Sequence, residues 1–164
     1  GLLPGAELAA TFNALRANDL VWPYVVNNYL LGGRPAAFDI LYWNADSTNL
    51  PGPMYCWYLR HLYLQNELRV PGRLTTCGEK VDVGAIKAPF YLYASREDHI
   101  VPWDAAYRST QMIKGKKRFV MGASGHIAGV INPPAKGKRN YWTNDRLVEG
   151  AEDWFDAATE HPGS

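Results

Sequence analysis

Residues 89–102 read PFYLYASREDHIVP and decide the fold class of this chain. Residues 89–94 form a nearly continuous apolar and aromatic run, which predicts a β-strand buried on both faces. A polar loop follows, and residues 102–113 predict a helix with the negative charge of Asp104 in its first turn. Strand, loop and helix in this order are typical of one unit of a parallel α/β sheet.

The elements on either side extend this pattern. Downstream, residues 117–121 predict a second strand and residues 145–159 predict a closing amphipathic helix. Upstream, residues 73–77 and 79–81 are short strand candidates that meet at Gly78. We therefore expect an α/β fold with a parallel sheet and crossover helices.

The chain before this sheet has a helical character. Three helices are predicted, at residues 7–15, 19–31 and 53–67, and residues 38–44 fit either a helix or an extended chain. We expect two parts, a helical segment over residues 1–69 and the α/β part over residues 70–164.

The composition is that of an ordinary globular domain. The 164 residues include 17 basic and 16 acidic side chains, and the formal charge of +1 gives no general attraction to nucleic acid or to an anionic membrane. No apolar stretch reaches the roughly 18 residues of a membrane span, and no signal peptide is visible. The chain begins at Gly1 without an initiator Met, so we expect it to be a piece of something longer.

The two cysteines, Cys56 and Cys77, do not form a recognisable motif. Their number and spacing predict neither a disulfide framework nor a metal site, which favours a reducing compartment. We expect both to be buried apolar thiols.

Two loops that follow predicted strands carry titratable residues. Asp98 lies in the first loop and His126 in the second, 28 residues later (126 − 98). Loops that follow adjacent parallel strands lie side by side at the carboxyl end of the sheet. We therefore expect the Asp98 carboxylate to accept the Nδ1 proton of His126, which leaves the other ring nitrogen free as a general base.

Other interpretations of these loops stay open. Glu97 and Asp104 are rival carboxylates, although a solvated side chain also explains Glu97 and a helix-start residue also explains Asp104. His126 is also explained as a loop histidine that only hydrogen-bonds its neighbours. His99, next to the expected acid, is explained as a residue that shapes the loop.

The nucleophile of such a triad is missing from the sequence. The strand–nucleophile–helix turn has the form GxSxG, or GxCxG for a thiol, and it precedes the acid and the base. Neither pattern occurs, and the nearest stretch, GASG at residues 122–125, has the wrong spacing and follows the acid. We expect the nucleophile in residues that precede Gly1; otherwise this chain does no chemistry.

Several longer motifs resemble those of one known family. The stretches SREDHIVPW (95–103) and GHIAGVINPP (125–134), which carry the expected acid and base, resemble polyhydroxyalkanoate synthases of class I. Four more stretches share the likeness: RANDLVW (16–22), FDILYWN (38–44), NLPGPMYCWYLR (49–60) and YLQNEL (63–68). The resemblance runs from about residue 8 to residue 161.

The resemblance implies the C-terminal part of an α/β-hydrolase fold, preceded by a helical cap. It implies an acyltransferase that polymerises (R)-3-hydroxyacyl-CoA, with 3-hydroxybutyryl-CoA expected, into polyester with release of CoA. Asp98 would be the acid and His126 the base of a Cys-His-Asp triad whose cysteine lies upstream of this chain. Activated thioester chemistry needs no metal and no cofactor beyond the CoA substrate.

The resemblance also implies binding residues and partners. Arg16 and Arg139 match positions expected near the CoA phosphates, and Asn66 and Trp43 match cap positions near the acyl channel. Solvated surface positions explain the arginines equally well, and core packing explains Trp43. The implied partners are the growing polyester chain, the missing N-terminal half and a second copy in a homodimer, in the cytoplasm at the surface of polyester granules.

Two alternative functions stay open from the sequence. A polyester depolymerase or esterase on the same fold would use the same acid and base. A non-catalytic dimerisation or binding module would fit a chain without a nucleophile.

Overall fold

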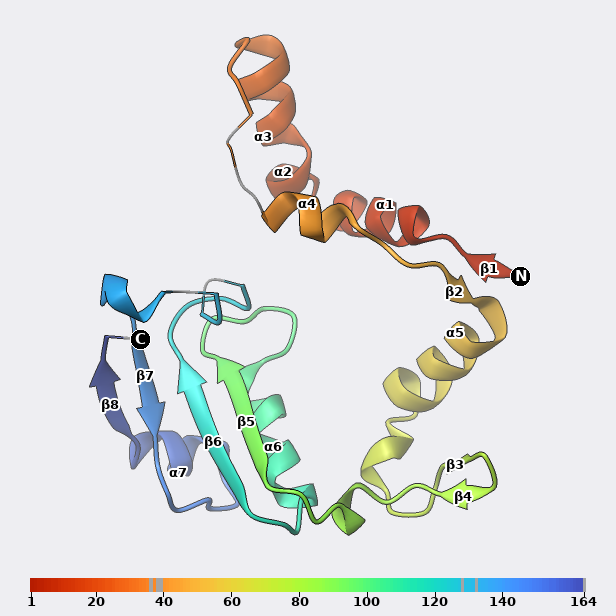
Figure 1. Cartoon of the computed structure of the whole chain (residues 1–164), viewed down its shortest axis with the longest axis vertical. Coiled ribbons are helices and arrows are strands. Elements are labelled where there is room, and N and C mark those ends of the chain that lie inside the picture. The colour runs from red at the N-terminus through yellow and green to blue at the C-terminus, as the bar shows by residue number, and fades with distance from the viewer. Residues whose placement is uncertain (36, 38–39, 128, 132, 164) are drawn as a thin grey trace. The chain divides into compact units, whose positions relative to one another are not determined.

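The computed structural model describes residues 1–35, 37, 40–127, 129–131 and 133–163. The chain divides into two compact units, Gly1–Asn66 and Glu67–Ser164. Figure 1 shows that the first unit is mainly helical and that the second is built on a sheet. This combination of helices with a sheet that contains a parallel pair confirms the expected α/β class.

The first unit consists of short helical segments. They are α1 (Gly5–Leu15), α2 (Ala17–Leu20), α3 (Trp22–Tyr24), a π-helical turn (Val25–Leu30), α4 (Ile40–Ala45), α5 (Gly52–Tyr58) and a second π-helical turn (Leu59–Leu64). Strand β1 (Leu2–Leu3) pairs antiparallel with β2 (Leu50–Pro51).

The predicted helices of this unit are present but more broken than expected. The helix expected over residues 19–31 is divided among α2, α3 and a π-helical turn, and it ends before Gly32, whose φ is 65°. The helix expected over residues 53–67 becomes α5 and a π-helical turn that ends at Leu64. Residues 38 and 39 of the ambiguous segment lie outside the described residues, and α4 shows that residues 40–44 are helical.

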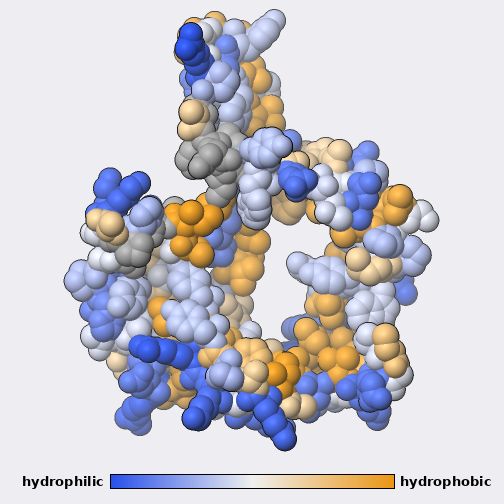
Figure 2. Space-filling model, viewed as in Figure 1, coloured by the Kyte–Doolittle hydropathy of each residue, from blue (hydrophilic) through white to orange (hydrophobic). Residues whose placement is uncertain are grey.

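The first unit does not bury its own apolar side chains. Of the residues in this unit whose burial is described, only Gly5, which has no side chain, is buried. Large side chains stand exposed on its helices, among them Phe12, Tyr29, Leu31, Trp43 and Tyr63, and Figure 2 shows apolar surface on these helices. Apolar surface on this scale is typical of an interaction face.

The second unit contains a four-stranded sheet with the order β5-β6-β7-β8 (Figure 1). Strands β5 (Phe90–Ser95) and β6 (Lys117–Gly122) are parallel and are joined by helix α6 (Trp103–Met112). Strands β7 (Asn140–Thr143) and β8 (Thr159–Pro162) continue the sheet in antiparallel pairing. The predicted strands and helix at residues 89–121 lie within one residue of their expected ends, whereas the sheet as a whole is mixed.

The core of this unit lies on one face of the sheet, where Figure 1 shows α6 and α7 (Ala151–Asp156). Tyr107, Phe119 and Trp154 pack ring against ring there, with centroids 4.9 to 5.5 Å apart. Because both helices cover the same face, β5 is not buried on both faces as predicted, and Tyr91 is 67% exposed.

The helix expected over residues 145–159 is much shorter than predicted. Asn144 accepts a hydrogen bond from Arg146 N (2.9 Å) and donates one to Trp154 O (3.1 Å), which holds the chain in a turn. The helix starts only after Gly150 and ends at Asp156, and the chain then turns back into β8. The hydrogen bonds of the Asn144 side chain thus hold a turn where the first turns of the helix were expected.

The described residues of the second unit also form a small hairpin upstream of the sheet and three 3₁₀ turns, two of them upstream of the sheet and one between β6 and β7. Strands β3 (Thr75–Thr76) and β4 (Glu79–Lys80) pair across Cys77 and Gly78, whose φ angles are 52° and 83°. Positive φ at both central residues is typical of the tight turn that suits a hairpin. The 3₁₀ turns are Glu67–Arg69, Val83–Ala85 and Pro134–Lys136.

The predicted burial of the cysteines is wrong. Cys77 sits in the hairpin turn and Cys56 on α5, and both are exposed free thiols. Helical periodicity places Cys56 among apolar residues, but that helix has no core beneath it in its own unit. Within the described residues, no helix is both long and apolar enough to span a bilayer.

Candidate active site

The acid-bearing and base-bearing loops are tied together beyond the ends of β5 and β6. The two strands are in register from Phe90 opposite Lys117 to Ser95 opposite Gly122. Backbone pairing continues into the loops, because Arg96 N donates to Gly122 O (2.8 Å) and Glu97 N donates to Ser124 O (3.0 Å). The parallel pairing therefore brings together residues that are far apart in the sequence.

Asp98 and His126 face each other at this edge. Nδ1 of His126 lies 3.9 Å from Oδ1 of Asp98, and their side chains are 34% and 14% exposed. The same Oδ1 accepts hydrogen bonds from the backbone N–H groups of Ile100 (2.8 Å) and Val101 (3.1 Å). The carboxylate is thus fixed by its own loop, and a slight approach of the imidazole would complete the bond, as is common in catalytic pairs without substrate.

The neighbouring titratable residues have other surroundings. Asp104 lies 3.4 Å from Arg108, one helical turn along α6, as expected of a helix-start residue. The side chain of Glu97 is exposed. The His99 ring meets the His126 ring edge to face, with centroids 5.1 Å apart. Among these candidates, Asp98 is the carboxylate that lies within 4 Å of the His126 ring.

The loop that carries His126 has an unusual backbone. Ser124 adopts φ 78°, a conformation that costs a non-glycine residue roughly 1–3 kcal/mol. Gly122 has no side chain for a steric reason, since a Cβ there would overlap the Tyr93 hydroxyl. A Cβ on Gly129 would lie 2.6 Å from Ser95 Oγ. Backbone strain at Ser124 and close packing at the two glycines favour a functional loop over a simple connection between strands.

The predicted phosphate ligand Arg139 lies at the same edge of the sheet. It directly precedes β7, which runs antiparallel to β6, and Ala123 N donates to Asn140 O at 3.0 Å. The Arg139 side chain is partly exposed, and its carbonyl accepts a hydrogen bond from Gly163 N at 2.7 Å. A partly exposed guanidinium at this edge has the charge and geometry that suit an anionic group.

The other predicted binding residues belong to the first unit. The Arg16 guanidinium bonds to Asp19, with Nε 2.9 Å from Oδ2. Trp43 is 71% exposed, which contradicts core packing within its own unit. Asn66 has a φ of 47° at the end of the unit. Their proximity to CoA or to an acyl channel stays a prediction.

Sequence reasoning missed the polar side chains on the open face of β5. The hydroxyl of Tyr93 donates to Gly129 O at 2.7 Å, and the 3% exposed Ser95 donates to the Tyr93 hydroxyl at 3.2 Å. Tyr93 and Ser95 are two residues apart, so they share one strand face. Hydroxyl groups at alternate positions of an otherwise apolar run are the sequence signal that could have identified these two residues.

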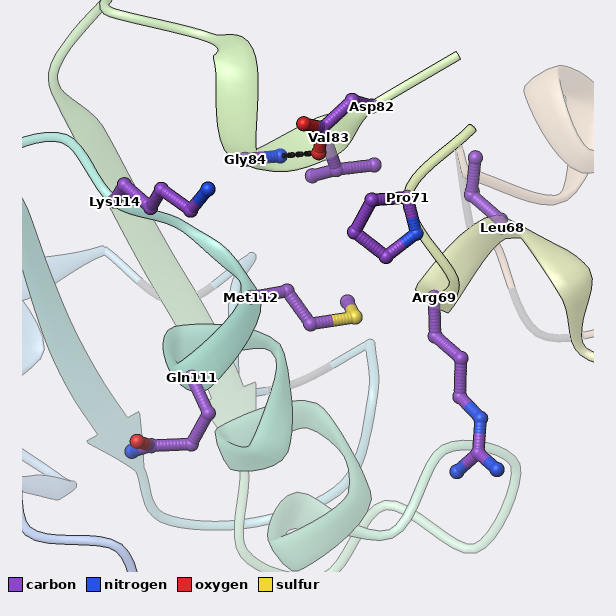
Figure 3. Close-up of a pocket in the computed structure, with 9 residues that line it drawn as sticks. All are labelled: Leu68, Arg69, Pro71, Asp82, Val83, Gly84, Gln111, Met112 and Lys114. Atoms are coloured by element: carbon purple, nitrogen blue, oxygen red, sulfur yellow. Dashed lines mark hydrogen bonds between the residues drawn. The ribbon is translucent and has the colours of Figure 1, made fainter. Parts of the chain in front are cut away.

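A small pocket lies at the other end of the strands. It has a volume of about 240 Å³, and Figure 3 shows the Met112 side chain extending toward Pro71 and Val83. Lys114, between α6 and β6, forms part of the wall. Because it lies at the amino ends of β5 and β6, this pocket is not part of the Asp98–His126 site. Within the described residues, no cluster of three or more His, Cys, Asp or Glu side chains is arranged to hold a metal.

Comparison with known proteins identifies close relatives. The chain is 66% identical over 163 residues to the poly(3-hydroxyalkanoate) polymerase subunit PhaC of Cupriavidus necator, a match that covers 99% of this chain and 28% of that protein. It is 47% identical to the poly(3-hydroxyalkanoate) polymerase of Methylorubrum extorquens, of which it covers 27%. It is 46% identical to poly(3-hydroxyalkanoate) polymerase 2 of Ectopseudomonas oleovorans, of which it covers 29%.

The chain thus spans less than a third of the length of these relatives while matching them along nearly its whole length. The model of the α/β hydrolase fold family matches residues 1–133, most of the chain. This match agrees with the parallel β5–α6–β6 unit and with the loops at its carboxyl edge. The chain therefore belongs to the α/β hydrolase fold family, and its sequence is similar to one part of the poly(3-hydroxyalkanoate) polymerases.

Proposed function

We propose that this chain is part of an acyltransferase that polymerises (R)-3-hydroxyacyl-CoA, with 3-hydroxybutyryl-CoA as the expected substrate, into polyhydroxyalkanoate with release of CoA. The observation that carries the proposal is the approach of His126 to Asp98 at the carboxyl edge of β5 and β6, with 3.9 Å between Nδ1 and Oδ1. The 66% identity to a polymerase subunit supports polyester synthesis over other reactions of the fold.

His126 acts as the general base in this proposal. Asp98 faces Nδ1, so Nε2 is the nitrogen available to take the proton of a nucleophilic thiol. That thiol belongs to a cysteine in a GxCxG turn upstream of Gly1. The thiolate attacks the thioester carbonyl carbon, the bond from that carbon to the CoA sulfur breaks, and the imidazolium returns its proton to the departing CoA thiolate.

Chain growth follows from the same pair of residues. The 3-hydroxyl of a second acyl group attacks the acyl-cysteine carbonyl, the new ester bond forms, and the cysteine sulfur leaves as a thiol. Removal of the hydroxyl proton falls to His126, with Asp98 assisting either the imidazole or the incoming hydroxyl. Asp98 suits this role because two backbone N–H groups hold its Oδ1 in place on the side of the His126 ring.

The binding residues complete the proposal. Arg16 and Arg139 hold the CoA phosphates, for which the planar guanidinium is suited by charge and by geometry. Asn66 and Trp43 lie near the acyl channel. The only non-protein group in the reaction is the CoA thioester itself, which is the substrate.

The first unit serves as the cap over the active site and takes part in a homodimer. Its exposed aromatic and aliphatic side chains, among them Phe12, Trp43 and Tyr63, support a role in covering other surfaces. Exclusion of water by such a cap protects the acyl-enzyme from hydrolysis. We place the enzyme in the cytoplasm at the surface of the polyester granules that it makes.

The experiment that tests this function compares the complete protein with this chain alone. Each is incubated with (R)-3-hydroxybutyryl-CoA, and released CoA, free 3-hydroxybutyrate and polymer are quantified by chromatography. The complete protein is expected to release CoA and to form polymer, and the isolated chain to release none. Free 3-hydroxybutyrate in place of polymer would indicate a hydrolase, and turnover by the isolated chain would place the nucleophile within residues 1–164.

A further inference from the structure

One side chain of β5 reaches across to the loop that carries the expected base. The Tyr93 hydroxyl donates to the carbonyl of Gly129 at 2.7 Å, a bond that spans 36 residues of sequence. The Tyr93 oxygen in turn accepts a hydrogen bond from Ser95 Oγ at 3.2 Å, and Ser95 is 3% exposed. Because Ser95 supplies the incoming proton, the phenolic proton of Tyr93 is committed to Gly129, and the two bonds reinforce each other.

Gly129 closes the turn in which His126 lies. The backbone N–H of Gly129 donates to Gly125 O at 2.9 Å, and that of Ile131 donates to Ile127 O at 2.9 Å. The start of the same segment is held by Glu97 N, which donates to Ser124 O at 3.0 Å. His126 therefore lies between two fixed points, one at Ser124 and one at Gly129.

The glycines of the loop make room for this arrangement. A Cβ on Gly122 would overlap the Tyr93 hydroxyl, and a Cβ on Gly129 would lie 2.6 Å from Ser95 Oγ. The Tyr93 side chain thus occupies the space of a Cβ at Gly122, and Ser95 Oγ is one of three oxygens that crowd a Cβ at Gly129. This mutual fit of a strand face and a loop supports a built anchor over an incidental contact.

We propose that Tyr93 is a positioning residue for the catalytic base, because its bond to Gly129 fixes the turn that directs His126 toward Asp98. The inference rests on the proposed function, in which His126 is the base. Tyr93 itself touches neither the expected acid nor the expected base in the contacts described, so its effect passes through the loop. The role therefore concerns the rate of the chemical steps and leaves substrate binding unchanged.

The test uses Tyr93→Phe in the complete polymerase and Tyr107→Phe as the matched control. Tyr107 is buried and, like the partly buried Tyr93, donates to a backbone carbonyl, Val148 O at 2.6 Å, but in the core of the unit. We expect Tyr93→Phe to lower kcat for CoA release about tenfold with KM within about twofold, since a small displacement of a catalytic group lowers the rate steeply. Tyr107→Phe is expected to lower Tm and to leave kcat within about twofold.

Hydrogen exchange gives a readout that does not depend on activity. In Tyr93→Phe, the backbone amides of residues 129–131 are expected to exchange about fivefold faster, with little change in α6, whereas Tyr107→Phe leaves this segment unchanged. Unchanged exchange there, or a kcat within twofold of the parent, would overturn the proposal. If the parent enzyme releases no CoA, the proposed function is refuted. In that case, faster exchange of residues 129–131 in Tyr93→Phe alone would still show that the bond from Tyr93 to Gly129 holds the loop.

Should Tyr93→Phe fail to fold, Ser95→Ala provides the second variant. It removes only the donor to Tyr93 and leaves the bond from Tyr93 to Gly129 in place. A smaller change in the same direction, about threefold in kcat and in exchange of residues 129–131, is expected. No change in either quantity would count against the anchor.

Discussion

Asp98 and His126 meet because β5 and β6 end level with each other, and the backbone pairing continues through Arg96 and Glu97 into both loops. The order of strand, helix and strand is enough to predict that approach from the sequence. The anchor from Tyr93 to Gly129 is not predictable in the same way, because it depends on which face of β5 the helices leave open. The prediction that the two cysteines are buried is wrong for a related reason, since side-chain periodicity does not reveal whether a core lies beneath a helix.

Gly129 offers a steric test of the site at the residue scale. A Cβ at this position would lie 2.6 Å from Ser95 Oγ and 2.8 Å from each of two backbone oxygens, those of Ala123 and Gly125. Because backbone atoms cannot rotate away, Gly129→Ala is expected to destabilise the unit by roughly 1–3 kcal/mol. Thermal unfolding of the complete protein measures the change.

Gly125→Ala is the matched control for this substitution. The nearest atom to its Cβ would be Glu97 O at 3.8 Å, which is an ordinary contact. The Tm of Gly125→Ala is therefore expected to stay close to that of the parent. A Tm of Gly129→Ala as high as that of Gly125→Ala would show that the loop is not packed against Ser95 as described.

Elements with strong local signals lie where the sequence predicts them. The apolar run of β5, the helix α6 and the strand β6 agree with prediction to within one residue at each end. Strand β8 (TEHP) carries no strand-favouring apolar run, and β7 (NYWT) is only four residues long. The antiparallel pairing of both strands depends on neighbours distant in sequence. The expected final helix fails because Asn144 offers the backbone a competing set of hydrogen bonds.

Tyr107 links α6 to the core and gives a prediction at the scale of elements. Burial raises the pKa of Tyr107 above its ordinary value of 10.0, and a hydrogen bond with Thr110 opposes part of that rise. Because the pKa of Tyr107 is higher in the folded state than in the unfolded state, the neutral phenol contributes to the stability of the fold. That contribution is complete below pH 10 and is lost as the pH rises through the folded-state pKa. We expect chemical denaturation to show stability falling above about pH 10, and falling less steeply in Tyr107→Phe. Equal slopes for parent and variant would contradict this account.

At the scale of the whole molecule, the two units differ in how they use their apolar residues. The second unit buries Tyr107, Phe119 and Trp154 in one cluster, whereas the first leaves Phe12 and Trp43 exposed. The match covers 28% of the polymerase subunit of Cupriavidus necator. Most of that relative's sequence therefore lies outside the match and is available to cover such a surface. The role of the first unit as a cap and the position of the nucleophile upstream of Gly1 stay predictions.

Trp43 provides the prediction at this scale. Its side chain is 71% exposed on α4, so its removal leaves no cavity in its own unit. Trp43→Ala in the complete polymerase is therefore expected to change Tm by less than about 2 °C while it raises the KM for 3-hydroxybutyryl-CoA severalfold. An unchanged KM would remove Trp43 from the acyl channel, and a large fall in Tm would assign it to packing.

Asp98 and His126 are proposed to act as one catalytic unit, and a double-mutant cycle measures whether they do. The rate of CoA release is measured for the complete polymerase and for His126→Ala, Asp98→Asn and the double variant, with Asp104→Asn as the control carboxylate. Each single variant is expected to lose about a thousandfold or more in kcat, and the double variant to lose no more than His126→Ala alone, because removing one partner already disables the other. Losses that multiply in the double variant, or either single variant within about tenfold of the parent, would contradict the account.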